Sequence, residues 1–138
     1  MAVTDPAGYA QRFDAAVART VAEAAAGSAG FAARLRRADL AADEIASVAQ
    51  LDRVPIMDKD ELLELQHADP PFAGLLGRGA SVRRVFQSPG PLYEPEPDRD
   101  DPWRWRPALA AAGFGPDDVV INAFGYHLSP AGAMFEEG

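Results

Sequence analysis

The first part of the chain carries hydrophobic residues at the spacing of an amphipathic helix. Asp5 and Pro6 are typical of a helix start, because aspartate caps free N–H groups and proline fits the first helical turn. The apolar residues that follow recur every four positions: Tyr9, Phe13, Val17 and Val21. Mixed charges on the other face favour packing within its own domain, although an alanine-rich helix of this kind can also bind a partner or a membrane surface.

Three shorter helices are predicted next along the chain. One covers residues 31–38, a second follows a cap at Asp43, and a third follows a cap at Asp58. Prolines and glycines then interrupt the pattern over residues 69–80, which we interpret as a helix end followed by a loop. Residues 1–80 are therefore predicted to be mainly helical.

The second part of the chain has the pattern of an α/β core. Residues 82–87 predict a strand, residues 102–112 predict a helix, and residues 119–124 predict a strand that is apolar on both faces. A further helix is predicted to begin near Ser129. A strand, a helix and a second strand form a βαβ unit, and such a unit needs neighbouring strands. Residues 81–138 are therefore predicted to be the truncated start of a larger α/β core.

Composition narrows the class of protein. The 138 residues are 48% hydrophobic and 25% charged, which is typical of one globular domain. Acidic residues outnumber basic ones by 21 to 13, and no block of lysine and arginine suggests nucleic-acid binding. The absence of cysteine excludes disulfides and thiolate chemistry. No apolar run approaches the roughly 20 residues of a membrane helix, and no secretory signal is recognisable, so we expect a cytoplasmic protein without membrane association.

The loop over residues 87–95 is the first candidate for chemistry. It lies between a predicted strand and a predicted helix, where α/β proteins usually bind phosphate. The Ser88 hydroxyl and the Gly90 backbone could contact a phosphate, whereas the three prolines of the loop remove N–H donors. A structural proline turn is the alternative, and the spacing by itself favours it.

Histidines and acidic residues offer weaker candidates. His67 and His127 lack the spacing of a zinc site, but His127 follows the predicted strand 119–124, at the sheet edge where α/β proteins place active sites. Ser129 is better explained as a helix cap than as a nucleophile. We interpret the acidic run over residues 94–101 as a solvated connector rather than a cation loop, and we predict no metal site.

Three segments resemble the N-terminal part of phenylacetate–CoA ligases, in the adenylate-forming (AMP-binding) synthetase superfamily. Residues 51–62, Leu-Asp-Arg-Val-Pro-Ile-Met-Asp-Lys-Asp-Glu-Leu, are similar to the family's entry segment L-x-x-L-P-x-x-x-K-x-x-L. Residues 86–95 fall at the position of its Ser/Thr/Gly-rich phosphate loop. Residues 111–126, which end in Asn-Ala-Phe-Gly-Tyr, are similar to the stretch A-A-G-x-x-x-x-D-x-x-x-N-x-Y-G-Y.

The resemblance implies a two-step ligase reaction. ATP and a small carboxylic acid would give an acyl-adenylate, which coenzyme A would capture as a thioester, with Mg²⁺ assisting. By position, Ser88 and Gly90 match a serine and a glycine of the phosphate loop. The segment that matches the family's aryl-acid pocket, with the histidine after it, supplies four pocket candidates: Phe124, Gly125, Tyr126 and His127.

The phosphate loop departs from the family pattern at most other positions. Glu94 stands where the family has a lysine, and a carboxylate there repels a triphosphate. Pro89, Pro91 and Tyr93 replace a serine, a threonine and a glycine. We therefore expect a degenerate loop, poor binding of ATP, Mg²⁺ and CoA, and no catalysis by this chain alone.

Two hypotheses follow from these patterns. The chain is either an N-terminal fragment of an acid–CoA ligase-like protein that lacks its C-terminal portion, or a stand-alone α/β interaction module. In the second case a partner chain would complete an open strand edge.

Overall fold

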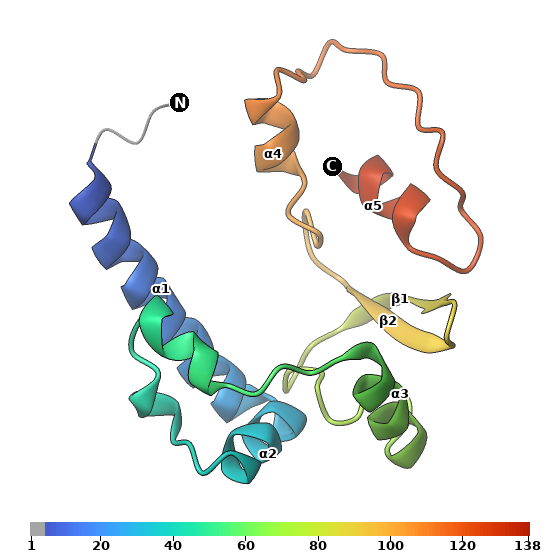
Figure 1. The fold of residues 1–138 in the computed structure, drawn as a ribbon. Coiled ribbons are helices and arrows are strands. Elements are labelled where there is room, and N and C mark those ends of the chain that lie inside the picture. The colour runs from blue at the N-terminus through green and yellow to red at the C-terminus, as the bar shows by residue number, and fades with distance from the viewer. Residues whose placement is uncertain (1–4) are drawn as a thin grey trace. The chain divides into compact units, whose positions relative to one another are not determined.

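The computed structural model describes residues 5–138. Over these residues the chain forms five α-helices, two 3-10 helices and one two-stranded antiparallel sheet, so the predicted mixture of helix and strand is confirmed (Figure 1). Two compact units are present: the chain up to Glu61 with Ala73–Gly79, and Leu62–Phe72 with Ala80–Gly138. No helix within residues 5–138 is both long enough and apolar enough to cross a membrane.

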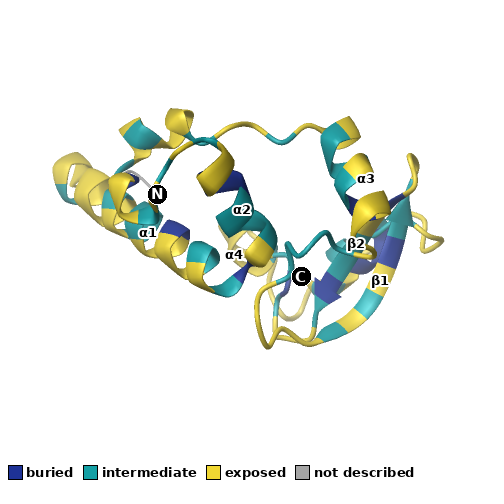
Figure 2. Cartoon of the chain, turned by 90° about the horizontal axis from the view of Figure 1, so that it is seen from below, coloured by how far each residue is buried: buried dark blue, intermediate teal, exposed yellow. Residues whose placement is uncertain are grey.

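Helix α1 (Pro6–Gly27) begins as predicted. The Asp5 carboxylate accepts a hydrogen bond from the Gly8 N–H at 2.9 Å. At the N-terminal end of the apolar stripe Tyr9 and Phe13 stack on each other with ring centroids 5.9 Å apart, yet they stay 50% and 48% exposed. Much of the helix surface is accordingly exposed in Figure 2, because the rest of the first unit packs against the C-terminal half of the helix.

Helix α2 (Ala29–Arg37) follows directly after a capping serine. The Ser28 hydroxyl accepts a hydrogen bond from the Phe31 N–H at 3.1 Å, which satisfies one free donor of the first turn. This turn brings α2 back against α1 and closes a small hydrophobic core. The buried residues of that core are Val21, Leu35 and Ile45.

Two short 3-10 helices, η1 (Ala42–Glu44) and η2 (Val48–Arg53), replace the single helix predicted after Asp43. The Glu44 carboxylate reaches back to accept a hydrogen bond from the Ala41 N–H at 2.7 Å. This contact begins the 3-10 turn at Ala42, so the predicted cap at Asp43 is wrong.

Helix α3 (Lys59–Ala68) has the predicted cap, since the Asp58 carboxylate accepts a hydrogen bond from the Glu61 N–H at 2.8 Å. The Glu61 side chain forms an ion pair at 2.8 Å with Arg34. The Arg34 side chain is only 6% exposed and also donates from Nε to the Pro55 carbonyl at 2.7 Å. The buried guanidinium is thus bonded on two sides within the first unit.

Strands β1 (Val82–Ser88) and β2 (Leu92–Pro97) form an antiparallel hairpin in the second unit. The strand predicted over residues 82–87 is confirmed. Much of the predicted loop 87–95 is instead strand, because Pro95 lies at a position whose missing N–H would point away from β1 and is not needed for pairing.

The strand predicted over residues 119–124 is wrong for this structure. These residues belong to the long connection that runs from α4 to α5 in Figure 1, and Val119 and Ile121 are 96% and 91% exposed. Since β1 pairs only with β2, residues 5–138 contain no βαβ unit. A strand that is apolar on both faces is stable only between other strands and covering layers, and the hairpin provides neither.

Two short helices complete the second unit, α4 (Arg106–Ala111) and α5 (Ala131–Glu137). The helix predicted over residues 102–112 begins later than expected, at Arg106, because Arg104 has a φ of 60°, which lies outside the right-handed helical region. Helix α5 begins close to the predicted position.

Candidate functional site

Ser88 and Gly90, the predicted phosphate contacts, lie at the turn of the β-hairpin. Ser88 ends β1, and Gly90 has a φ of 136°, a backbone conformation that favours glycine. The turn leads into a second strand rather than into a helix, so no helix N-terminus follows it. The Ser88 Oγ is buried and has no hydrogen-bond partner within residues 5–138.

The end of β1 contacts the segment that carries the other candidates. The Gln87 N–H donates to the Leu128 carbonyl at 2.9 Å. The fold therefore brings the turn with Ser88 and Gly90 against the chain immediately after His127, although the two regions are about 40 positions apart in the sequence.

A cavity of about 840 Å³ lies in the second unit, between α4, residues 114–126 and α5. Phe124 and Tyr126 line it, whereas Gly125 and His127 are not among its lining residues. Most of the other lining side chains are apolar, among them Leu109, Phe114 and Ile121. The cavity is therefore suited to an apolar ligand of small-molecule size.

Three aromatic rings pack together next to this cavity, and two of them, Phe124 and Phe135, line it. Phe124 stacks on Phe135 of α5 with centroids 4.5 Å apart and planes inclined by 10°. Trp105 packs against the same Phe135 at 4.6 Å with a 37° inclination. Such a stack presents flat apolar faces, which can receive another planar ring.

Asn122 fixes the turn after the aromatic segment. Its Nδ2 donates to the Tyr126 hydroxyl at 2.9 Å and to the Gly132 carbonyl at 2.8 Å. The Gly132 N–H in turn donates to the Gly125 carbonyl at 3.1 Å, and a Cβ on Gly132 would lie 2.6 Å from that oxygen. Only glycine allows this close approach of α5. The exposed His127 does not line the cavity.

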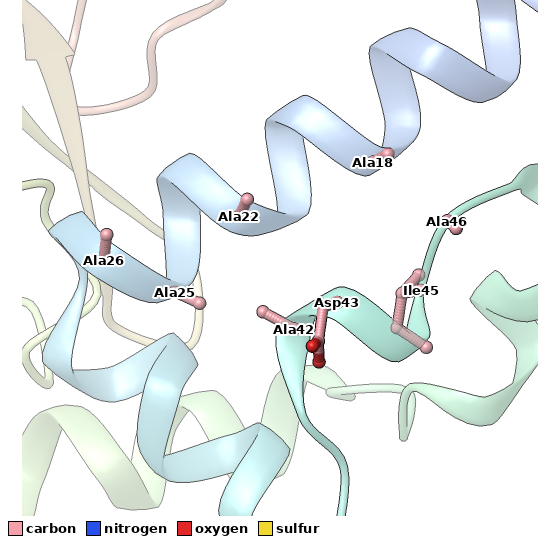
Figure 3. Close-up of a pocket in the computed structure, with 8 residues that line it drawn as sticks. All are labelled: Ala18, Ala22, Ala25, Ala26, Ala42, Asp43, Ile45 and Ala46. Carbon is pink, nitrogen blue, oxygen red and sulfur yellow. The ribbon is translucent and has the colours of Figure 1, made fainter.

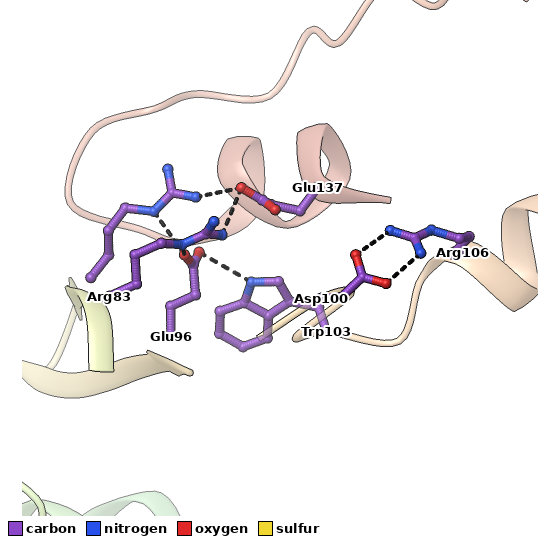
Figure 4. A network of polar contacts seen from close by, with 7 residues as sticks. Arg83, Glu96, Asp100, Trp103, Arg106 and Glu137 are labelled. Atoms are coloured by element: carbon purple, nitrogen blue, oxygen red, sulfur yellow. Dashed lines mark hydrogen bonds and ion pairs between the residues drawn. The ribbon is translucent and has the colours of Figure 1, made fainter. Parts of the chain in front are cut away.

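A charged pair stands at the edge of the cavity. Arg106, which lines it, donates from both terminal nitrogens to the two oxygens of Asp100, at 2.7 and 2.9 Å (Figure 4). The Arg106 hydrogen bonds hold the pKa of Asp100 below its ordinary value, and the Asp100 carboxylate raises the pKa of Arg106 further.

The sequence reasoning did not identify Arg106 or Phe135 as site residues. Arg106 belongs to no recognisable motif, since it stands in a helix start that contains several charged residues. Phe135 lies in a short terminal helix whose apolar pattern predicts packing rather than binding. Only the folding of α5 onto residues 122–126 places both residues at the same cavity.

A second polar cluster surrounds the carboxylate of Glu96, which has no exposed surface (Figure 4). A β-bulge at Arg83 inserts one extra residue into β1, so Arg83 and Arg84 both reach this carboxylate, each at 2.8 Å. The same two guanidinium groups contact Glu137 at 2.6 and 2.9 Å, and the Trp103 Nε1 donates to Glu96 at 3.4 Å.

The Glu96 cluster is a structural site. Burial raises the pKa of Glu96, but the hydrogen bonds from Arg84, Arg83 and Trp103 outweigh burial and hold the pKa below its ordinary value. A carboxylate that is ionised and fully paired is not poised to accept or donate a proton. It stabilises the hairpin and its contact with α5.

A groove of about 690 Å³ in the first unit is a weaker candidate (Figure 3). Eight of the described residues line it; six are alanines of α1 and of residues 42–46, and Asp43 is the one charged residue among the eight. Alanine methyl groups provide shape but no hydrogen-bonding specificity, so this groove does not define a ligand.

Metal binding finds no support in the described part of the chain. Within residues 5–138, no three or more histidine, aspartate or glutamate side chains gather in a group that could hold a metal ion. In the acidic run, Glu96 and Asp100 are instead paired with arginines.

Comparison with known proteins adds no family assignment. A scan against models of protein families gave no match, and a search of curated proteins gave no match either. The resemblance to acid–CoA ligases therefore rests on the motifs of this sequence.

Proposed function

We propose that this chain is the N-terminal part of an acid–CoA ligase-like protein and that it supplies part of the pocket for a small aromatic carboxylic acid. The observation that carries the proposal is the aromatic cavity in the second unit. Phe124 and Tyr126, the two aromatic residues that match the family's pocket segment, both line it. Its volume of about 840 Å³ lies within the range of small-molecule sites.

The phosphate half of the reaction is not supplied by this chain. The hairpin turn offers one glycine, no lysine and a buried serine hydroxyl, so its residues do not fit a triphosphate. The ATP, Mg²⁺ and CoA that the family uses would depend on further parts of the protein. The chain alone is therefore inactive in this proposal.

Residues 119–124 have a defined role in the proposal. In a complete adenylate-forming domain they would be the second strand of a βαβ unit with β1, covered by further strands and helices. Their apolar composition and the exposure of Val119 and Ile121 support this role, because such side chains gain stability only when they are covered.

The acid pocket can be tested by NMR titration of the purified chain with phenylacetate. We expect chemical-shift changes centred on Phe124, Tyr126 and Phe135. Phe124→Ala should weaken binding about fivefold or more, because it removes one stacked ring. Phe13→Ala is a matched control, since Phe13 has similar exposure (48% against 52%) but lies in the first unit. Equal effects of the two substitutions would contradict the proposed pocket.

The inactivity of the isolated chain can be tested separately. We expect no acid-dependent exchange of pyrophosphate into ATP, because the degenerate turn cannot hold the triphosphate. Robust exchange would show that this part of the proposal is wrong. A reading frame that continues downstream into further adenylate-enzyme motifs would support the fragment directly.

A second candidate function is an interaction module that accepts a strand from a partner. The observation that favours it is an asymmetric hairpin: the Gln66 side chain covers the edge of β2 at Tyr93, whereas Val85 on the edge of β1 is 51% exposed. Such an edge can pair with an extended peptide. Cooperative unfolding and a well-dispersed NMR spectrum of the 138-residue chain would favour this alternative, and non-cooperative unfolding would contradict it.

A further inference from the structure

One positively charged side chain, Arg106, lines the cavity of the second unit, and it is paired with the carboxylate of Asp100. Among the residues within 5–138 that line the cavity, Arg106 is the only one with a positive charge. Asp100 approaches it with two parallel hydrogen bonds at 2.7 and 2.9 Å, the geometry in which arginine recognises a carboxylate (Figure 4). Arg106 is therefore presented in a conformation that suits a bidentate anion.

The other polar groups of the cavity do not compete for the same role. Asn122 donates to Tyr126 and to the Gly132 carbonyl, so its amide is used within the protein. Glu136 is negatively charged and would repel an anion placed next to it. An anionic ligand is consequently directed toward Arg106, with its apolar part against the aromatic rings.

A ligand carboxylate can take the place of Asp100 as the partner of Arg106. The side chains are 53% and 82% exposed, and exposed ion pairs contribute little net stability. A ligand carboxylate would form the same two hydrogen bonds while its ring gains contact with Phe124 and Phe135. Release of Asp100 costs little free energy, because water can solvate its carboxylate.

We propose that Arg106 recognises the carboxylate of a planar aromatic monocarboxylate in this cavity and that Asp100 is an internal competitor, which the ligand displaces. This inference rests on the proposed function in one respect, namely that the cavity accepts an aromatic acid. It adds that Arg106 selects an anionic ligand and that Asp100 limits the affinity for this ligand.

The experiment compares phenylacetate with the neutral phenylacetamide by NMR titration of the 138-residue chain. Asp100→Asn should tighten phenylacetate binding about threefold to tenfold and leave the amide unchanged, because it frees Arg106 without altering the apolar walls. Arg106→Gln should weaken phenylacetate about tenfold or more and again leave the amide unchanged. Arg106→Lys should give an intermediate value, since lysine keeps the charge but loses the bidentate geometry.

Asp98→Asn is the matched control for charge. Asp98 is an exposed neighbour in the same acidic run and makes no ion pair among the described residues, so its removal should change phenylacetate affinity less than about twofold. Equal effects of Asp98→Asn and Asp100→Asn would overturn the competitor role. The NMR spectrum of each variant shows directly whether the second unit is still folded.

The outcomes separate this inference from the proposed function. If phenylacetate and phenylacetamide bind every variant equally well, the role of Arg106 is overturned while the aromatic pocket remains. If neither compound perturbs the second unit of the original chain or of Asp100→Asn, the pocket and the inference are both overturned.

Discussion

Glu96 is a carboxylate with 0% exposed surface, held by two adjacent arginines and a tryptophan. In a regular strand Arg83 and Arg84 would point to opposite faces of the sheet. The bulge at Arg83 removes this alternation, so both side chains reach one acid. At the scale of single residues, a local irregularity in β1 thus makes it possible to bury a charge.

Glu96→Gln should lower the free energy of unfolding of the second unit by roughly 1–3 kcal/mol, because two guanidinium groups lose their charged partner. The lower end is expected, since the arginine side chains are 37% and 38% exposed and water can solvate them in part. Urea denaturation measures the change. Glu94→Gln on the same strand is the control, and an equal loss in that variant would contradict the special role of Glu96.

The hairpin has two different edges at the scale of the element. Pro95 removes one N–H from the edge of β2, and the Gln66 amide of α3 pairs with both backbone groups of Tyr93 at 2.9 Å. Gln66 acts there as a substitute for the next strand, which explains why the buried residue of α3 is a polar one. On the edge of β1, the Gln87 N–H donates to the Leu128 carbonyl.

Gln66→Ala should expose the Tyr93 amide to solvent exchange. Its N–H bonds to the Gln66 side chain, so hydrogen exchange at Tyr93 should accelerate much more than at Glu94, whose backbone faces β1. We also expect a loss of roughly 1–3 kcal/mol in the stability of the second unit.

Glu64→Ala, at an exposed position of the same helix, should leave Tyr93 exchange unchanged. Unaltered exchange at Tyr93 in Gln66→Ala would show that another group protects this amide.

At the scale of the whole chain, hydrogen bonds and ion pairs lower the pKa of carboxyl groups in both units. The hydrogen bonds from Ala41 and Arg53 lower the pKa of Glu44 in the first unit. In the second unit the pKa values of Glu96 and Asp100 are also lowered by their arginine partners. Each of these groups binds its proton more weakly in the folded chain than in the unfolded chain.

Stability should therefore fall as the pH is lowered. The contribution of each group is complete above its unfolded pKa, for which the ordinary values are 4.5 for glutamate and 3.8 for aspartate, and is lost as the pH falls through the lowered folded pKa. Urea denaturation between about pH 7 and pH 3 tests this expectation. Glu96→Gln should show a shallower decline than the original chain, whereas an equal slope would mean that Glu96 titrates as in the unfolded state.

The local part of this structure could be read from the sequence because it depends on neighbouring residues. Asp5 and Asp58 cap helices as predicted, since a cap joins a side chain to an N–H three residues away. The strand at residues 82–87 and the end of α3 before residue 70 were predictable for a similar reason. Phe124 and Tyr126, chosen from a motif, also line the cavity.

Only the tertiary structure decided how these elements are completed. The hydrophobic pattern of residues 119–124 predicts a strand, but a strand forms only where partners supply hydrogen bonds and cover, and β1 pairs with β2 instead. The cavity likewise depends on Arg106 and Phe135, which meet Phe124 through the fold rather than through any spacing in the chain. Short-range hydrogen bonds are encoded by adjacent residues, whereas strand pairing and cavities depend on contacts between distant segments.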